Sequence, residues 1–235
     1  DQGEDTISLH AENDSYSCLD MTLTSNDDIS STEPELGTGD AQDIPDNTWD
    51  GELASTLQMF WWADDGDNVY EVGEHPLTTD AQGAPLVKSV DQMFGAGHVF
   101  SAPLADATHN VWDPSNPGPI PANQTAYIAK AWCFGTMTPV AAGQGVNPSV
   151  NPGVTCDGKL FGNETQTDGM TMNIAFRAIQ SRNNKDFVCG NENPRLATLK
   201  VIKHVNNIHG GNNIITDFHL FIDDGNVATN VTSGV

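Results

Sequence analysis

Short runs of alternating hydrophobic and polar residues recur along the chain, and clusters of Gly, Pro, Asn and Asp separate them. This period of two predicts β-strands at residues 6–10, 19–24, 127–134, 170–179, 199–205 and 218–222. One segment, Leu53–Trp62, has a helical spacing instead, with Leu53, Leu57 and either Phe60 or Trp61 on one face. Many short strands separated by turns are typical of a β-sandwich, so we expect an all-β fold.

Three long segments show neither period and are predicted to be loops. Residues 25–49 are acidic, residues 102–122 contain five prolines, and residues 136–158 are rich in Gly, Pro and Asn. Loops of this length are unusual in a compact domain unless they are functional or packed against a neighbour. The composition of Cys189–Leu196 resembles a domain boundary. We therefore expect one domain at residues 1–195 and a short β segment at residues 196–235.

Charge is distributed very unevenly. The net charge is −23, and residues 1–87 contain 21 acidic residues and no Lys or Arg, whereas the remainder has 11 acidic and 9 basic residues. Such a field repels phosphate backbones, which excludes nucleic acid as a partner. No stretch approaches the ~20 apolar residues of a membrane span, so we expect no membrane-spanning segment.

The cysteines indicate an oxidising compartment. The chain has four, Cys18, Cys133, Cys156 and Cys189, with no Cys-x-x-Cys pair. An even number fits two disulfides, and buried free thiols are the alternative. Four cysteines allow three pairings; if Cys133 and Cys156 staple one Gly/Pro-rich loop, Cys18 and Cys189 remain to tie the N-terminal region to the middle.

Other features of the sequence also favour an extracellular protein. The first residues do not form a signal peptide, so we expect an export signal to have been removed. Four Asn-x-Ser/Thr triplets are glycosylation candidates, and they begin at Asn13, Asn123, Asn163 and Asn230.

The acidic loop Asp64–Glu74 has the composition of a calcium site. Calcium takes six to eight oxygen ligands, and EF-hand loops supply them at alternate positions with a terminal Glu. Counting from Ala63, which stands where an EF-hand loop has its first ligand, the candidate ligands are Asp64 (from a shifted register), Asp65, Asp67, the carbonyl of Val69, Glu71 and Glu74. Asn68 replaces the usual Gly, and Asn tolerates a left-handed backbone. The alternative is a solvated acidic turn; a bound calcium ion would be structural and would rigidify the loop.

Catalytic motifs are missing from the sequence. No His-Glu-x-x-His, Gly-x-Ser-x-Gly or phosphate-binding Gly loop occurs among the 235 residues, so we do not expect an enzyme. Trp61 and Trp62 are adjacent, so on a strand they face opposite ways. We expect one in the core and one against a loop, with a carbohydrate platform as the alternative.

Several of these segments resemble exported TasA/camelysin-like proteins over about residues 1–190. The similar segments are Leu53–Glu74, Ile128–Gly135, Asn163–Asp168 and the Met170–Ile179 strand that leads into Gln180–Asn184. The resemblance implies a jelly-roll-like β-sandwich, export, and in several relatives polymerisation into extracellular fibres or pili by strand exchange. The C-terminal segment Leu199–Val235 resembles the opening strands of a prealbumin-like surface domain.

We therefore expect a structural subunit of an extracellular filament or pilus, whose partners are copies of itself arranged head to tail. The predicted donor strand is Thr6, Ile7, Ser8, Leu9 and His10, because an isolated terminal strand can complete the open sheet edge of another subunit. The region 199–235 is the second candidate donor. The alternative function is a monomeric, calcium-stabilised adhesion module of a larger cell-surface protein.

Overall fold

The computed structural model describes residues 2–159, 162–190, 221–222 and 225–226. The chain divides into two compact units, Asp1–Glu192 and Asn193–Val235, close to the predicted boundary. In the second unit, β11 (Phe221–Ile222) and β12 (Gly225–Asn226) form a short antiparallel pair. The predicted strand 199–205 and the sequon at Asn230 lie outside the described residues.

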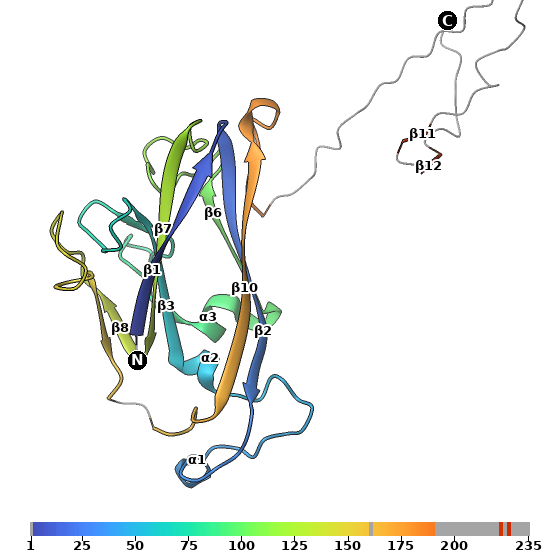
Figure 1. The fold of residues 1–235 in the computed structure, drawn as a ribbon, viewed down its shortest axis with the longest axis vertical. Coiled ribbons are helices and arrows are strands. Elements are labelled where there is room, and N and C mark those ends of the chain that lie inside the picture. Colours follow the sequence, from blue (N-terminus) through green and yellow to red (C-terminus); the bar gives the residue numbers. More distant parts are fainter. Residues whose placement is uncertain (1, 160–161, 191–220, 223–224, 227–235) are drawn as a thin grey trace, which may run out of the picture. The chain divides into compact units, whose positions relative to one another are not determined.

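The first unit contains two antiparallel sheets that pack face to face (Figure 1). Sheet A has the order β1-β7-β3-β4, with β5 also paired to β3, and sheet B has the order β10-β2-β6. The strands of sheet A are β1 (Gln2–Ala11), β3 (Leu57–Asp64), β4 (His75–Pro76), β5 (Lys88–Ser89) and β7 (Gln124–Phe134). Those of sheet B are β2 (Ser15–Asp28), β6 (Val99–Ala105) and β10 (Asp168–Gln180). The predicted all-β fold is confirmed.

Helices are short and lie in the connections. They are α1 (Glu35–Thr38), α2 (Leu53–Thr56), α3 (Val90–Phe94) and the 3₁₀ turns η1 (Gly95–Gly97) and η2 (Ser181–Asn183). The prediction of a helix over Leu53–Trp62 is therefore wrong after Thr56. The aromatic run that follows pairs along its whole length with β7, and aromatic residues favour a pleated, buried surface over a helix.

A hairpin occupies part of the segment that the sequence predicted to be a loop at residues 136–158. Its strands, β8 (Thr136–Pro139) and β9 (Val154–Asp157), pair antiparallel. Met137 and Val154 point from this hairpin onto the outer face of sheet A. The hairpin thus covers that face, which accounts for the long insertion.

Sheet A is buried on both faces. Trp61 lies in the core between the sheets, with Leu19, Met21 and Ile128. Trp62 lies on the opposite face, where its Nε1 donates to the Val69 carbonyl at 3.2 Å. Both indoles are almost fully buried. One Trp is in the core and the other is packed against a loop, and neither is a carbohydrate platform.

Two disulfides fasten the sheets to their surroundings. Cys18 of β2 is bonded to Cys189, and Cys133 of β7 is bonded to Cys156 of β9. The second bond holds the covering hairpin against sheet A. No cysteine is free, so the free-thiol alternative is wrong. Among the described residues, no helix is long and apolar enough to cross a membrane.

Candidate functional site

The predicted donor residues lie on β1, which forms one edge of sheet A (Figure 1). β1 pairs with β7 along its full length, from Gln2 opposite Cys133 to Ala11 opposite Gln124. None of its side chains belongs to the fully buried core; Ile7 and Leu9 pack against the core while remaining partly exposed. Its attachment therefore depends mainly on the backbone ladder to β7.

The inward face of β1 changes character along the strand. Leu9 and Ile7 are apolar, but the next residues on the same face of the strand are Asp5, whose side chain is 64% exposed, and Gly3. The carboxylate of Asp5 pairs with Lys130 Nζ at 3.0 Å. A Cβ on Gly3 would come within 2.7 Å of the Trp132 indole. At this end of the strand, β1 therefore adds no apolar side chain to the core.

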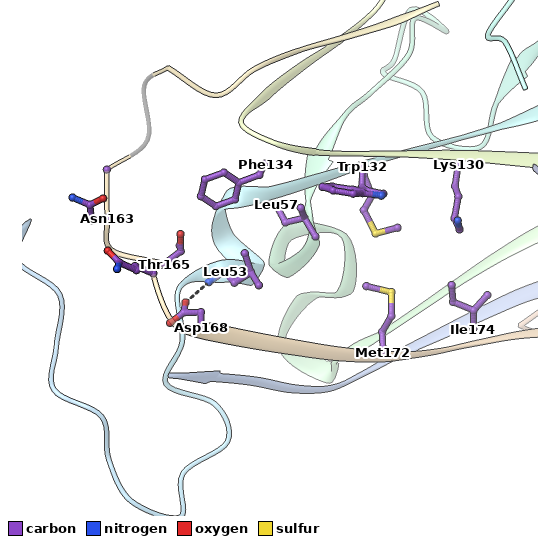
Figure 2. Close-up of a pocket in the computed structure, with 13 residues that line it drawn as sticks. Leu53, Leu57, Lys130, Trp132, Phe134, Asn163, Thr165, Asp168, Met172 and Ile174 are labelled. Atoms are coloured by element: carbon purple, nitrogen blue, oxygen red, sulfur yellow. Dashed lines mark hydrogen bonds between the residues drawn. The ribbon is translucent and has the colours of Figure 1, made fainter. Parts of the chain in front are cut away.

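A groove opens between the sheets beside this end of β1. Its volume is about 770 Å³. Figure 2 shows Trp132, Leu57 and Phe134 on one wall and Met172 and Ile174 of β10 on the other. Large apolar side chains thus remain accessible here; Trp132 is 36% exposed and Ile174 is 37% exposed.

Three of the predicted calcium ligands come together at the end of β3. One carboxylate oxygen from each of Asp64, Asp65 and Asp67 lies within 4.8 Å of the others; we call this group the loop cluster. The loop turns sharply because Gly66 and Asn68 have φ of 113° and 64°, so Asn68 does adopt the left-handed backbone. The loop cluster can hold a metal ion.

Asp64 is the anchor of the loop cluster. It is only 3% exposed, and its Oδ2 accepts hydrogen bonds from the N–H of Gly66 at 3.0 Å and of Asn68 at 3.4 Å. Its Oδ1 is buried without a hydrogen-bond partner. A buried carboxylate oxygen is costly to leave unpaired, so this atom is the one that a cation would satisfy.

The remaining predicted ligands have other partners in this structure. Glu74 accepts the N–H groups of Asp65 at 3.0 Å and Glu71 at 2.8 Å, which closes the base of the loop. Glu71 accepts the Gly145 N–H at 2.6 Å. The Val69 carbonyl accepts the Trp62 indole N–H. Val69, Glu71 and Glu74 therefore lie outside the three-carboxylate group and shape the loop.

Electrostatics around the loop favour proton or cation uptake. Burial, aided by the charge of Asp64, raises the pKa of Glu74 to about 8. Burial also raises the pKa of Asp64, in spite of the lowering effect of its hydrogen bonds. Both carboxyl groups thus lack a compensating charge.

One contact between the two candidate sites was not predicted. The Thr6 hydroxyl of β1 lies 3.1 Å from Asp64 Oδ2 and 2.9 Å from Asn68 Oδ1. The sequence separation is 58 and 62 residues, so no local pattern could reveal it. The donor strand and the loop cluster are therefore physically linked.

The described glycosylation candidates are exposed. Asn13 lies in the turn between β1 and β2, Asn123 lies just before β7, and Asn163 lies at the rim of the groove. Asn123 donates its backbone N–H to the Ala11 carbonyl, so the first two sequons are at the same end of the sandwich.

The chain matches no protein family, no curated protein and no solved structure. The likeness to TasA/camelysin-like proteins and to prealbumin-like domains therefore stays a prediction from sequence motifs.

Proposed function

We propose that this protein is a structural subunit of an extracellular filament, in which β1 of one copy pairs with β7 of the next. The observation that carries the proposal is that β1, a strand with no fully buried side chain, forms the edge of a sheet. Because its bonds are mostly backbone bonds to β7, an identical strand from a second copy makes the same bonds in trans.

The connection between β1 and β2 suits such an exchange. Only Glu12, Asn13 and Asp14 separate the two strands, and short hinge loops favour swapping of an element between copies. Ten residues of extended strand span about 33 Å, which is enough to reach along a neighbouring sandwich. Exchange of this kind is heterologous and does not close on itself, so it builds a filament.

Calcium at the loop cluster is the second part of the proposal. The hard oxygen ligands of Asp64, Asp65 and Asp67 suit calcium, and Thr6 connects Asp64 to β1. Association also brings the acidic residues of several copies together. We therefore expect assembly to depend on divalent cations or on salt.

Crosslinking between copies tests strand exchange directly. Asp5 and Lys130 lie opposite each other in the β1–β7 ladder. We expect a mixture of Asp5→Cys and Lys130→Cys chains, assembled and then mildly oxidised, to give disulfide-linked dimers on a non-reducing gel. The matched control replaces Lys130→Cys with Ser101→Cys, which is exposed on β6 in the other sheet.

Electron microscopy completes the test. Filaments from the full chain and monomers from a chain lacking residues 1–12 support the proposal. Filaments from the shortened chain, or equal crosslinking to the Ser101→Cys control, contradict the role of β1. Monomers of the full chain, with or without calcium, contradict the filament and favour the adhesion-module alternative, because β1 would then pair only with β7 of its own copy.

A further inference from the structure

A second group of carboxylates lies at the C-terminal end of β2, outside the predicted calcium loop. One oxygen from each of Asp28, Glu35 and Asp168 lies within 4.8 Å of the others; we call this group the ladder cluster. Asp28 is 2% exposed and Glu35 is 0% exposed. Three acidic groups that are this close and this buried strongly repel one another unless a positive charge lies among them.

The position of the cluster in the β2–β10 ladder adds to this repulsion. Asp28 of β2 and Asp168 of β10 are direct partners in the antiparallel register. Like charges directly opposite each other destabilise a strand pair. No Lys or Arg occurs in the first 87 residues, so the segment that holds Asp28 and Glu35 supplies no basic side chain of its own.

Several oxygens in this region are buried without a partner, which points to a missing ligand. Asp28 Oδ1 has no hydrogen-bond partner although the residue is almost fully buried. Asp168 is partly exposed, but its Oδ1 atom is also buried without a partner. Glu52 Oε2 and Asp40 Oδ2 are also buried and unpaired. The charge of Asp40 acts on the cluster, since burial and this charge raise the pKa of Asp28. Burial and the charge of Asp40 also raise the pKa of the neighbouring Glu52 to about 7.

The other carboxylate oxygens are held in place by neighbouring donors. Asp168 Oδ2 accepts the N–H groups of Glu52 at 2.6 Å and Leu53 at 2.8 Å, at the start of α2; Figure 2 shows the bond toward Leu53. Glu35 Oε2 accepts the N–H of Thr32 at 3.1 Å and lies 3.1 Å from the Thr167 hydroxyl. The oxygens are thus fixed in orientation before any ion arrives.

We propose that the ladder cluster is a calcium site that fastens the acidic segment 29–52 to the adjoining ends of β2 and β10. The donor set consists of oxygen alone, with no His or Cys, which suits a hard cation. The Thr167 hydroxyl, 3.1 Å from Glu35 Oε2, can add a further oxygen, and calcium accepts six to eight. The ion would replace the repulsion between β2 and β10 with a bridge.

Hydrogen exchange of the full chain, followed by mass spectrometry in EGTA and in calcium, tests the proposal. We expect peptides from residues 29–52 to exchange more slowly in calcium, by roughly a hundred-fold at one hundred times Kd. Asp28→Asn and Glu35→Gln should each abolish this protection. Asp64→Asn should leave it intact, because that residue belongs to the loop cluster.

Each outcome has a definite meaning. Unchanged exchange of residues 29–52 in wild type at millimolar calcium overturns the proposal, and so does protection that persists in both Asp28→Asn and Glu35→Gln. The wild-type measurement needs no variant to fold. Loss of crosslinked filaments with intact protection of residues 29–52 would contradict the proposed function alone, so the two proposals fail separately.

Discussion

The loop cluster and the ladder cluster contain the same kind of ligand but are built in opposite ways. The loop cluster comes from four consecutive positions, Asp64 to Asp67, in a turn set by Gly66 and Asn68. The ladder cluster comes from the end of β2, from α1 and from the start of β10, so its members are up to 140 residues apart (168 − 28). One site is local and the other exists only after the sheets have formed.

This difference changes what a cation does at each site. In the loop cluster, Asp65 is exposed and solvent screens part of the repulsion. In the ladder cluster, Asp28 and Glu35 are buried, so the repulsion opposes the pairing of β2 with β10. We infer that the loop ion tightens a turn, whereas the ladder ion stabilises the sandwich itself.

The largest expected effect is that of removing calcium from both sites. A ligand at 1,000 times its Kd stabilises the folded state by about 4 kcal/mol per site. Occupancy of both clusters therefore raises the thermal midpoint by at least about 15 °C over the EGTA-treated protein, taking about 2 °C per kcal/mol. Differential scanning calorimetry measures this shift, and an unchanged midpoint contradicts structural calcium at either cluster.

The next effect separates the two clusters in the absence of metal. In EGTA, Asp28→Asn should stabilise the protein by about 1–2 kcal/mol, because it removes a buried charge with an unpaired oxygen. Asp64→Asn should change stability by less than about 1 kcal/mol. It also relieves a buried unpaired oxygen, Oδ1, but it weakens the hydrogen bonds that Oδ2 accepts from Gly66 and Asn68, and the two effects oppose each other. Urea unfolding of both variants in EGTA tests the difference; equal effects would mean that the clusters are not distinct.

A smaller effect is expected where β1 meets the loop cluster. Thr6→Val keeps the side-chain shape but removes the hydroxyl that reaches Asp64 and Asn68. We expect a loss of about 1 kcal/mol and faster crosslinking between copies. Ser8→Ala on the same strand is the control, and it should leave both quantities unchanged. An equal response from both variants would contradict the proposed connection between the loop cluster and strand exchange.

The smallest effect involves Asp20, an acidic residue of the β2–β10 ladder that has a basic partner. Asp20 of β2 accepts hydrogen bonds from Arg177 Nε at 2.7 Å and from Ser101 at 2.7 Å. Burial raises the pKa of Asp20, but these bonds and the charge of Arg177 outweigh it, and the net pKa is lowered. Asp20→Asn should cost about 0.5–1 kcal/mol at neutral pH, since the pair is partly exposed.

The pH dependence at Asp20 has a definite sign. A lowered pKa means that the stabilisation is fully present above the unfolded pKa of about 4 and is lost as the pH falls through the folded value. The difference between wild type and Asp20→Asn should therefore disappear in acid. Asp20→Asn should also destabilise the protein in EGTA, the opposite sign to Asp28→Asn; a shared sign would contradict the contrast between paired and unpaired carboxylates.

Much of the sandwich could be predicted because alternation is a local property. Strands at residues 6–10, 19–24, 127–134 and 170–179 all fall within observed strands. The helix predicted over Leu53–Trp62 is wrong only from Leu57 onward, where the apolar residues fit a helical face and a doubly buried strand equally well. In the folded protein this segment pairs with β7 and is covered by the β8–β9 hairpin, and neither contact can be read from spacing.

The sequence by itself determined the alternation that makes an all-β fold, the even number of cysteines and the acidic spacing of the loop cluster. Tertiary structure alone decided which cysteines pair, how Thr6 reaches Asp64, and that Asp28, Glu35 and Asp168 meet. The physical reason is the distance along the chain over which each kind of interaction acts. Periodicity and turn chemistry act between neighbours in the chain, whereas the meeting of distant carboxylates depends on the register of β2 with β10.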